Sequence, residues 1–210
     1  MRTHHLPLVL RQHLAALRML LVFTVLTGVV YPLVVTGIAQ AAFPHQANGS
    51  LVRTHGKPVA SSLIGQSFAL PKKNPGDPKE ELLPDPRWFQ PRPSAGGYDP
   101  MASGASNLGP NNPDLVATVR ERRAAVAAFD RVSPASVPVD AVTASGSGLD
   151  PAVSPAYAYE QVNRVAKARR LAPARVRKLV AEHVQGRVLG FLGQENVNIV
   201  ELNHDLAGLM

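Results

Sequence analysis

The glycine-rich stretch Ser145-Gly146-Ser147-Gly148 comes closest, by residue type, to a reactive loop. Backbone N–H groups of such loops cradle phosphates, but a P-loop continues with Gly-Lys-Ser/Thr. Here Leu149, Asp150 and Pro151 follow, and the carboxylate of Asp150 would repel a phosphate. The Gly-x-Ser-x-Gly pattern of a nucleophile elbow is also absent. The stretch therefore favours a tight turn that leads into a helix.

The histidines and aspartates do not form a recognisable metal site or catalytic triad. The histidines of the C-terminal part show neither H-x-x-x-H nor H-E-x-x-H spacing: His45, His55, His183 and His204. Cysteine is absent, which excludes disulfides and thiolate metal sites. Three aspartates could approach Ser145 or Ser147 in the folded chain, but such scattered residues do not indicate a catalytic triad: Asp99, Asp140 and Asp150. No catalytic residue, no metal ligand and no cofactor of its own are expected.

The apolar stretch Met19–Phe43 determines where the other segments of the chain lie relative to a membrane. As a helix its 25 residues would be roughly 37 Å long, which exceeds a bilayer core of about 30 Å. A cleavable secretory signal is the alternative, because Ala39-Gln40-Ala41 resembles a cleavage site. Signal-peptide cores are shorter, at about 7–15 residues. The length therefore favours one uncleaved transmembrane helix.

Charge around this helix predicts its orientation. Arg2, Arg11 and Arg18 precede it without any carboxylate, so the positive-inside rule keeps the N-terminus in the cytoplasm. We expect a cytoplasmic tail at residues 1–18, the span at 19–43, and an extracytoplasmic domain at residues 44–210.

One face of the predicted span carries small residues and a proline. Thr24, Gly28, Pro32 and Thr36 recur every fourth residue. Because Pro32 lacks an N–H group, the carbonyl of Gly28 loses its helical partner and a kink is expected. Small side chains allow another helix to approach closely, so this face is a candidate packing surface. The alternative is that glycine and proline are simply common in membrane helices.

The net charge of +7 does not indicate a nucleic-acid partner. Without the three N-terminal arginines, 19 basic and 15 acidic side chains remain. No cluster of Lys and Arg alternates with aromatic residues, which excludes the usual nucleic-acid footprint.

Residues 44–210 read as a mixed α/β domain. Segments 50–54 and 57–64 flank His55-Gly56 and predict a hairpin. The proline-dense region 70–100 excludes a long helix or central strand, and its Trp88 and Phe89 would pin it to the core or bind a ligand.

Capping residues followed by proline predict the helices of this domain. Asn112-Pro113 begins one, Ser154-Pro155 begins a second that runs to about Arg170, and Pro173 begins a third that ends near Gly186. Strands are expected at residues 138–144 and 197–202, with the tight turn at 145–148 following the first of them.

Four segments together resemble the C subunit of the Kdp potassium-transporting ATPase, the KdpC family. They are Arg92-Pro-Ser-Ala95 with Tyr98-Asp99, Ser106–Pro110, Val142–Pro151 and Val197–Asn203. Their order, the single anchor and the length match over nearly the whole chain. Two positions depart from the family pattern: Pro91, where glycine is usual, and Ala152, where histidine is common. The candidate interface or structural residues in these segments are Arg92, Ser94, Asn107, Gly109, Ser145, Gly146, Ser147, Gly148 and Asp150.

The resemblance implies a non-catalytic subunit of a bacterial inner-membrane pump that imports potassium at the expense of ATP. The implied partners are a channel-like A subunit and a P-type ATPase B subunit, together with the lipid bilayer.

The family's C subunit is described as a catalytic chaperone that raises the ATP affinity of the B subunit. The predicted topology leaves only residues 1–18 beside cytoplasmic ATP, which favours indirect nucleotide contact. The alternative is a signal-anchored exported module that binds a solute or cell-wall polymer.

Overall fold

The structure is a computed structural model that describes residues 7–74, 76–77, 80 and 82–209. The chain separates into two units, Met1–Ser50 and Leu51–Met210. The first holds the apolar helix and the second holds a folded domain, so each is described by itself.

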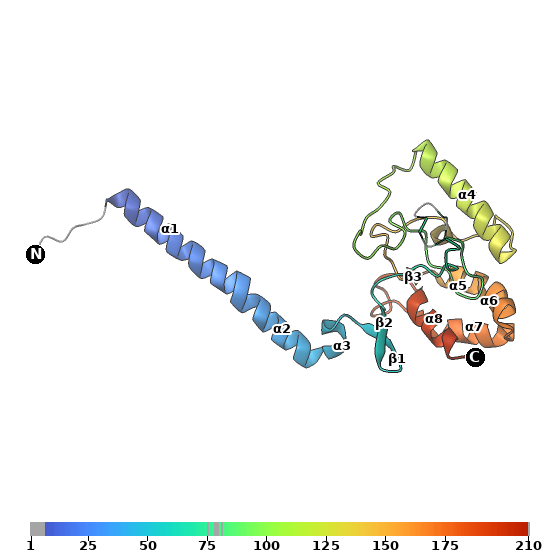
Figure 1. Cartoon of the computed structure of the whole chain (residues 1–210). Coiled ribbons are helices and arrows are strands. Elements are labelled where there is room, and N and C mark those ends of the chain that lie inside the picture. The colour runs from blue at the N-terminus through green and yellow to red at the C-terminus, as the bar shows by residue number, and fades with distance from the viewer. Residues whose placement is uncertain (1–6, 75, 78–79, 81, 210) are drawn as a thin grey trace, which may run out of the picture. The chain divides into compact units, whose positions relative to one another are not determined.

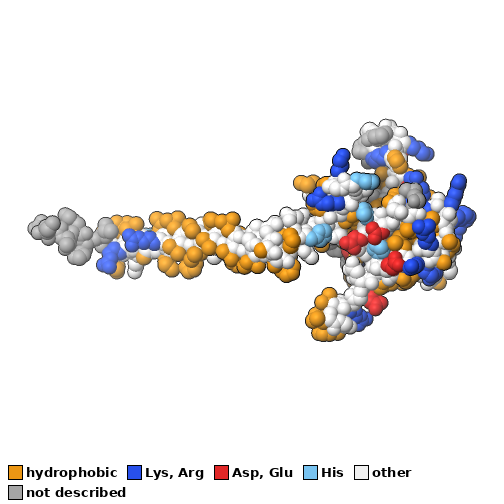
Figure 2. All heavy atoms as spheres, turned by 90° about the horizontal axis from the view of Figure 1, so that it is seen from below, with side chains coloured by type: hydrophobic (Ala, Val, Ile, Leu, Met, Phe, Trp, Pro, Cys, Tyr) orange, Lys and Arg blue, Asp and Glu red, His pale blue; other side chains and the backbone are white. Residues whose placement is uncertain are grey.

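The apolar helix runs from Leu8 to Ala42 as α1 (Leu8–Val25), η1 (Leu26–Val30) and α2 (Tyr31–Ala42). Its mean hydropathy of 2.2 and its length are sufficient to cross a membrane. Figure 2 shows hydrophobic side chains along it and basic side chains near its N-terminal end. The helix therefore begins well before Met19, and the membrane boundaries at residues 19 and 43 stay predictions. A short helix, α3 (Pro44–Ala47), follows.

Pro32 distorts this helix as a widened turn. Residues Leu26–Val30 form a π-helix, and the N–H of Tyr31 bonds to the carbonyl of Leu26 five residues earlier. A π-turn relieves the clash between the proline ring and the preceding carbonyls. The ribbon continues unbroken through the segment (Figure 1). The distortion expected at Gly28–Pro32 is therefore a π-helical turn, which holds one residue more than an α-helical turn.

The predicted hairpin is confirmed at the start of the folded domain. Strands β1 (Leu51–Thr54) and β2 (Lys57–Ser61) pair antiparallel. His55 and Gly56 connect them with φ angles of 51° and 78°, as a tight hairpin turn requires.

A second sheet has the strand order β3-β5-β4, with all pairs antiparallel. The same unit also contains helices, which confirms the mixed α/β class (Figure 1). The remaining elements are α4 (Pro113–Asp130), η2 (Val139–Ala141), β3 (Ala152–Val153), α5 (Pro155–Glu160), α6 (Val162–Arg169), α7 (Pro173–Glu182), β4 (Val184–Gln185), β5 (Asn196–Asn198) and α8 (Ile199–Ala207).

The three predicted helix starts, at Pro113, Pro155 and Pro173, are confirmed, and side chains cap the first two. The side chain of Asn112 accepts from the N–H of Asp114 at 2.8 Å, and Ser154 accepts from Tyr157 at 3.1 Å. The second helix is interrupted at Gln161, so α5 and α6 replace one continuous element.

The strand predicted at 138–144 is wrong. Residues Val139–Ala141 form a 3₁₀ turn instead. The carboxylate of Asp140 accepts from the N–H and hydroxyl of Ser154 at 2.6 and 2.9 Å. This contact joins the 3₁₀ turn to the N-terminus of α5.

The C-terminal predictions were only half right. The third helix ends at Glu182, and Val184–Gln185 pairs with β5 before Gly186 is reached. Strand β5 stops at Asn198, whose side chain accepts from the N–H of Val200 at 3.0 Å and so begins α8. The strand expected at 197–202 is therefore mostly helix.

Two side-chain amides attach the proline-rich region to the core. Asn203 exchanges two hydrogen bonds of 2.9 Å with the backbone of the fully buried Phe89. Gln161 does the same for Gln90, at 2.6 and 3.0 Å. These amides replace the strand partner that a proline-rich chain lacks. Of the two readings offered for Trp88 and Phe89, attachment to the core is the one the structure shows.

Candidate functional site

The serine-glycine turn at 145–148 closes on itself. The hydroxyl of Ser145 accepts from the N–H of Gly148 at 2.9 Å, and that of Ser147 accepts from the N–H of Leu149 at 3.1 Å. Gly148 has a φ of 68°, in the region that favours glycine. Ser145 and Gly148 are buried, while Gly146 and Ser147 are exposed at the crest. The predicted tight turn is confirmed, but strand β3 follows it before helix α5 begins at Pro155.

Three successive backbone carbonyls of this turn accept hydrogen bonds from three distant segments. The carbonyl oxygen of Ser147 accepts from the N–H of Gly104 at 2.8 Å and from the hydroxyl of Ser103 at 3.0 Å. The carbonyl oxygen of Gly148 accepts from the hydroxyl of Ser94 at 2.7 Å. The carbonyl oxygen of Leu149 accepts from the N–H of Gly65 at 2.7 Å. A phosphate cradle needs free N–H groups, and those of Gly148 and Leu149 are already engaged. The turn acts as a junction of the domain.

Arg92 and Asp150 join the first and third motif segments. Their side chains form an ion pair with Nη1 and Oδ2 3.1 Å apart, and each is about a quarter exposed. Arg92 also donates to the carbonyl of Thr143 at 3.3 Å, and Asp150 accepts from the N–H of Ala152 at 2.9 Å. Asp150 is thus neutralised within the domain.

Tyr98 and Gly65 complete the packing around this pair. The hydroxyl of Tyr98 donates to the carbonyl of Arg92 at 2.5 Å, and its N–H donates to Ser94 Oγ at 3.0 Å. Burial raises the pKa of Tyr98, so this hydroxyl stays protonated. A Cβ added at Gly65 would lie 2.6 Å from the carbonyl oxygen of Asp150 and 2.8 Å from the Tyr98 ring. Sequence reasoning missed Gly65, and an isolated glycine after a strand was its only signal.

The other two motif segments differ in where they lie. Strand β5 pairs with β3, and the N–H of Ile199 donates to Pro151 O at 2.8 Å, so the C-terminal segment joins the turn. Asn107 and Gly109 are exposed on a loop, and the structure does not bring either to the junction. Their proposed interface role stays a prediction.

A groove of about 460 Å³ opens beside this junction. Arg92, Asp140, Asp150 and Glu195 contribute its charges. Three carboxylates against one guanidinium make it unfavourable for a phosphate or nucleotide.

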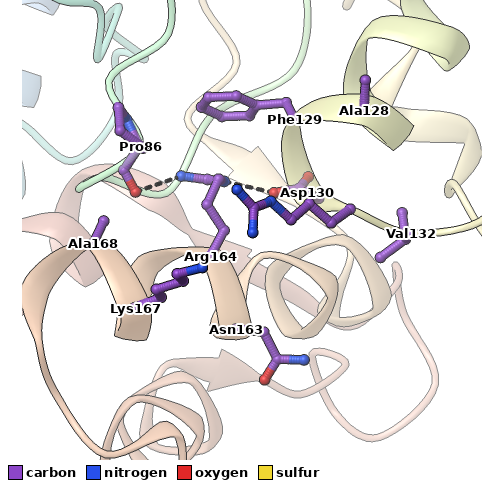
Figure 3. A pocket seen from close by; sticks show the side chains of 10 residues that line it. Pro86, Ala128, Phe129, Asp130, Val132, Asn163, Arg164, Lys167 and Ala168 are labelled. Atoms are coloured by element: carbon purple, nitrogen blue, oxygen red, sulfur yellow. Dashed lines mark hydrogen bonds and ion pairs between the residues drawn. The ribbon is translucent and has the colours of Figure 1, made fainter.

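A second pocket, of about 640 Å³, lies between α4 and α6 (Figure 3). Its buried Arg164 donates to Asp130 Oδ1 at 2.5 Å and to the carbonyls of Pro86 and Trp88 at 2.8 and 2.9 Å. Gln161 accepts a further bond from Arg164 at 2.6 Å. Figure 3 shows the Arg164 side chain reaching from α6 towards both Pro86 and Asp130. All its bonds go to the protein, so Arg164 fastens α4, α6 and the proline-rich region together.

Glu160 lies at the end of α5, and its side chain is partly buried. Its Oε1 is buried and has no hydrogen-bond partner among the described residues. Burial, followed by the charges of Asp130 and Asp140, raises the pKa of Glu160 to about 7. The folded domain therefore holds this carboxyl protonated more tightly than the unfolded chain does.

Replacing Glu160 with glutamine is expected to stabilise the domain above pH 7 and to change little near pH 4.5. The benefit of binding the proton is complete at low pH and is lost as pH rises from about 4.5 to 7. Partial exposure limits the effect to about 1 kcal/mol, or about 2–4 °C in Tm. Thermal unfolding at pH 5 and pH 8 measures it, with the exposed Glu121→Gln as the control. An equal Tm change at both pH values would contradict this assignment.

The π-turn aligns the small-residue face of the membrane helix. In a regular α-helix each four-residue step advances about 40°, so Thr24 and Thr36 would stand about 120° apart. The extra residue of a π-turn takes back about 100° of that rotation. Thr24, Gly28, Pro32 and Thr36 therefore share one face. A Cβ added at Gly28 would meet nothing within 4 Å in this chain.

A comparison with protein families shows which family this chain belongs to. The family described as KdpC, K⁺-transporting ATPase, c chain, matches residues 13–208. The chain belongs to the KdpC family. The family resemblance expected from the sequence is thereby confirmed. Among the described residues, no group of three or more His, Asp or Glu side chains could hold a metal ion.

Curated KdpC relatives extend over nearly the whole chain. A potassium-transporting ATPase KdpC subunit of Streptomyces avermitilis is 50% identical and covers 93% of both chains. Those of Kineococcus radiotolerans and Sorangium cellulosum are 54% and 53% identical, each over 92% of this chain and over 92% and 95% of their own.

Proposed function

We propose that this chain is the accessory, non-catalytic subunit of a Kdp-type pump that imports potassium with energy from ATP. The observation that carries the proposal is the KdpC match over residues 13–208. The geometry agrees, because the motif residues form a structural junction and their polar groups bond to one another.

The proposed partners are a channel-like A subunit and a P-type ATPase B subunit. In the proposed complex, ATP is bound and hydrolysed by the B subunit. This chain supports assembly and raises the ATP affinity of that subunit through indirect contact. The engaged N–H groups of Gly148 and Leu149 and the carboxylates of the groove support indirect contact, because both features are unfavourable for a phosphate.

Purification in a mild detergent tests the function. A tagged pump subunit is expected to bring two large multi-span subunits with it, identified by mass spectrometry as a potassium channel-like protein and a P-type ATPase. The rival function, an exported solute- or cell-wall-binding module, predicts that the chain purifies alone. Recovery of the chain without either subunit, under conditions that keep the pump intact, would refute the proposal.

The proposed location is the bacterial inner membrane, with the N-terminus in the cytoplasm and the domain outside it. Arg11 and Arg18 lie in the helix on the N-terminal side of the uncharged stretch Met19–Phe43, and they support this orientation. A reporter that works only after export, fused to the C-terminus, is expected to be active. A reporter that works only in the cytoplasm is the control, and its activity would reverse the orientation.

Replacing Gly28 with leucine is expected to leave membrane insertion intact and to reduce recovery of the partner subunits several-fold. The face formed with Thr24, Pro32 and Thr36 allows close helix approach, and packing of this kind drives association in lipid. The space around Gly28 is open in this chain, so a larger side chain disturbs only a partner. The matched control is Val30→Leu, about half a turn away. Equal recovery with both variants would make the helix a passive anchor.

A further inference from the structure

Two histidines at the C-terminal ends of helices α7 and α8 share one carboxylate. His183 caps the end of α7, and its Nε2 lies 3.1 Å from Asp205 Oδ2. His204 is in the last turn of α8, and its Nδ1 lies 3.0 Å from Asp205 Oδ1. The side chains of His183 and His204 are 14% and 33% exposed, and that of Asp205 is 54% exposed. The three side chains form a partly buried cluster that joins α7 to α8.

The other nitrogen of each ring lies beside a backbone carbonyl. His183 Nδ1 is 2.9 Å from the carbonyl oxygen of Leu179, one turn earlier in α7. His204 Nε2 is 3.2 Å from the carbonyl oxygen of Arg53 in strand β1, 151 positions away in the chain. The cluster therefore also connects α8 to the β1–β2 hairpin that begins the folded unit.

All four partners of these two rings are hydrogen-bond acceptors. A carbonyl oxygen and a carboxylate oxygen have no hydrogen to donate, whereas a neutral imidazole carries one N–H group and the charged imidazolium carries two. A neutral ring at either position would place a bare nitrogen against an oxygen lone pair. The four contacts can all be hydrogen bonds only when both rings are protonated. The helix ends favour this charge, because the C-terminal carbonyls of α7 and α8 carry negative partial charge.

The other charged side chains on these elements leave the two rings to Asp205. With the histidine of the hairpin turn, they are Lys178 and Glu182 on α7, Glu201 on α8, and Arg53, His55 and Lys57 in the hairpin. Lys178 and Glu182 pair with each other at 3.7 Å, and Arg53 Nη1 donates to the carbonyl of Gly56 at 3.1 Å. Arg169 of α6 also reaches α8, where it donates to the carbonyl of Leu206 at 3.4 Å. Among the described residues, none of these side chains bonds to either ring.

Packing between the hairpin and α8 is incomplete beside His204. A cavity of about 160 Å³ is lined there by residues of both elements, among them Val52, Ala60 and Val200. The bond from His204 to Arg53 therefore lies where apolar contact leaves a gap. Just beyond the hairpin, Asn198 Nδ2 donates to the carbonyl of Ser62 at 2.7 Å, and this amide does not titrate. A change in the charge of His204 should thus act on the hairpin more than on its base.

We propose that His183, Asp205 and His204 form a pH-dependent clasp, which fastens the β1–β2 hairpin and the end of α7 to α8 when both rings are charged. Histidine is the side chain that ordinarily changes charge between pH 5 and 8. The stabilisation is complete at the acidic end of this range and is lost as pH rises through it, because each ring then gives up one of its two hydrogen bonds. The clasp belongs to the chain alone, and only its response to the pH of the external medium rests on the proposed location.

The first test measures the Tm of the full chain in detergent at pH 5.5 and pH 8.5. His204→Gln replaces the ring by a neutral amide that does not titrate. The wild type is expected to unfold about 2–4 °C above this variant at pH 5.5 and within about 1 °C of it at pH 8.5. The titration of Glu160 occurs in both chains and cancels from these differences. An equal difference at the two pH values would overturn the proposal.

The matched control is His55→Asn in the hairpin turn. His55 is exposed, and its ring makes no hydrogen bond among the described residues. Asparagine tolerates the φ of 51° at this position. The Tm difference between this variant and the wild type should be the same at both pH values. A difference that changes with pH as much as that of His204→Gln would assign the effect to any lost histidine and would overturn the clasp.

The second test locates the effect by amide hydrogen exchange of residues 51–61, followed by mass spectrometry. The wild type and His204→Gln are compared at the same pH, so the intrinsic pH dependence of exchange cancels. At pH 6 the hairpin of the wild type is expected to exchange about threefold more slowly or better, and at pH 8 the two rates should converge. Equal exchange of the hairpin in both chains at pH 6 would mean that the cluster does not hold it, which would overturn the proposal.

Discussion

Replacing Gly148 with valine is expected to destabilise the folded domain by about 3 kcal/mol or more. Gly148 has a φ of 68°, which a β-branched residue adopts only at a cost of about 1–2 kcal/mol. An added Cβ would lie 2.7 Å from the carbonyl oxygen of Gly104. That oxygen belongs to backbone, so it cannot move aside as a flexible side chain would, and overpacking adds about 1–3 kcal/mol.

Thermal unfolding of the full chain in detergent measures the effect, which should lower Tm by about 10 °C. Gly146→Val is the matched control, because a Cβ at Gly146 meets nothing within 4 Å and the residue is exposed. A stable Gly148→Val protein would mean that the turn does not hold these segments of the domain together. If instead Gly146→Val keeps its Tm and loses partner subunits, the crest of the turn is an interface.

The second large effect is expected at Arg164. Arg164→Met leaves the carboxylate of Asp130, whose side chain is 1% exposed, without its cation. Breaking a buried pair by removing one partner costs about 3–5 kcal/mol. Burial raises the pKa of Asp130 while Arg164 opposes the shift. Without Arg164 the carboxyl should take up a proton, so the loss of stability should be greater at pH 8 than at pH 5.

Lys167→Met, one turn further along α6, is the control for Arg164→Met. Lys167 lines the same pocket and is exposed, so removing its charge should change Tm by little. Thermal unfolding of both variants at pH 5 and pH 8 separates loss of the buried pair from loss of one positive charge. Equal Tm values for the two variants would exclude Arg164 as the fastener of α4 and α6.

The elements that could be predicted from the sequence are those whose signals are local. Asn112 and Ser154 each cap the helix that begins at the next residue, and both caps are present. His55-Gly56 likewise forms the hairpin turn within its own neighbourhood. These elements can be predicted because the side chains and backbone groups that form each cap or turn lie within a few residues of one another.

The errors occur where a distant contact decides the local structure. Residues 138–144 alternate like a strand, but Asp140 bonds to Ser154 fourteen residues away. Apolar residues after Val197 also suit a strand, but they form helix α8, whose Leu202 and Leu206 pack into the core of the domain. Periodicity cannot distinguish these cases, because short apolar runs fit either element.

The sequence predicted that residues 145–148 form a tight turn, but it did not predict that distant segments bond to this turn. The serine-glycine sequence indicates tight backbone geometry, and Gly148 has it. The donors to its carbonyls come from Gly65, Ser94 and the 103–104 segment, and no spacing rule connects these positions. Only the family resemblance grouped Arg92 with Asp150 before the structure placed them in contact.

The amide of Asn203 also sets the order in which the domain can form. Its two bonds to Phe89 connect positions 114 residues apart in the chain. The proline-rich region therefore cannot reach its final conformation until the last helix has left the ribosome. Contacts of such long range slow folding, because a large loop must close first. Late ordering of the proline-rich region is compatible with the proposed export, in which the chain crosses the membrane before the domain folds.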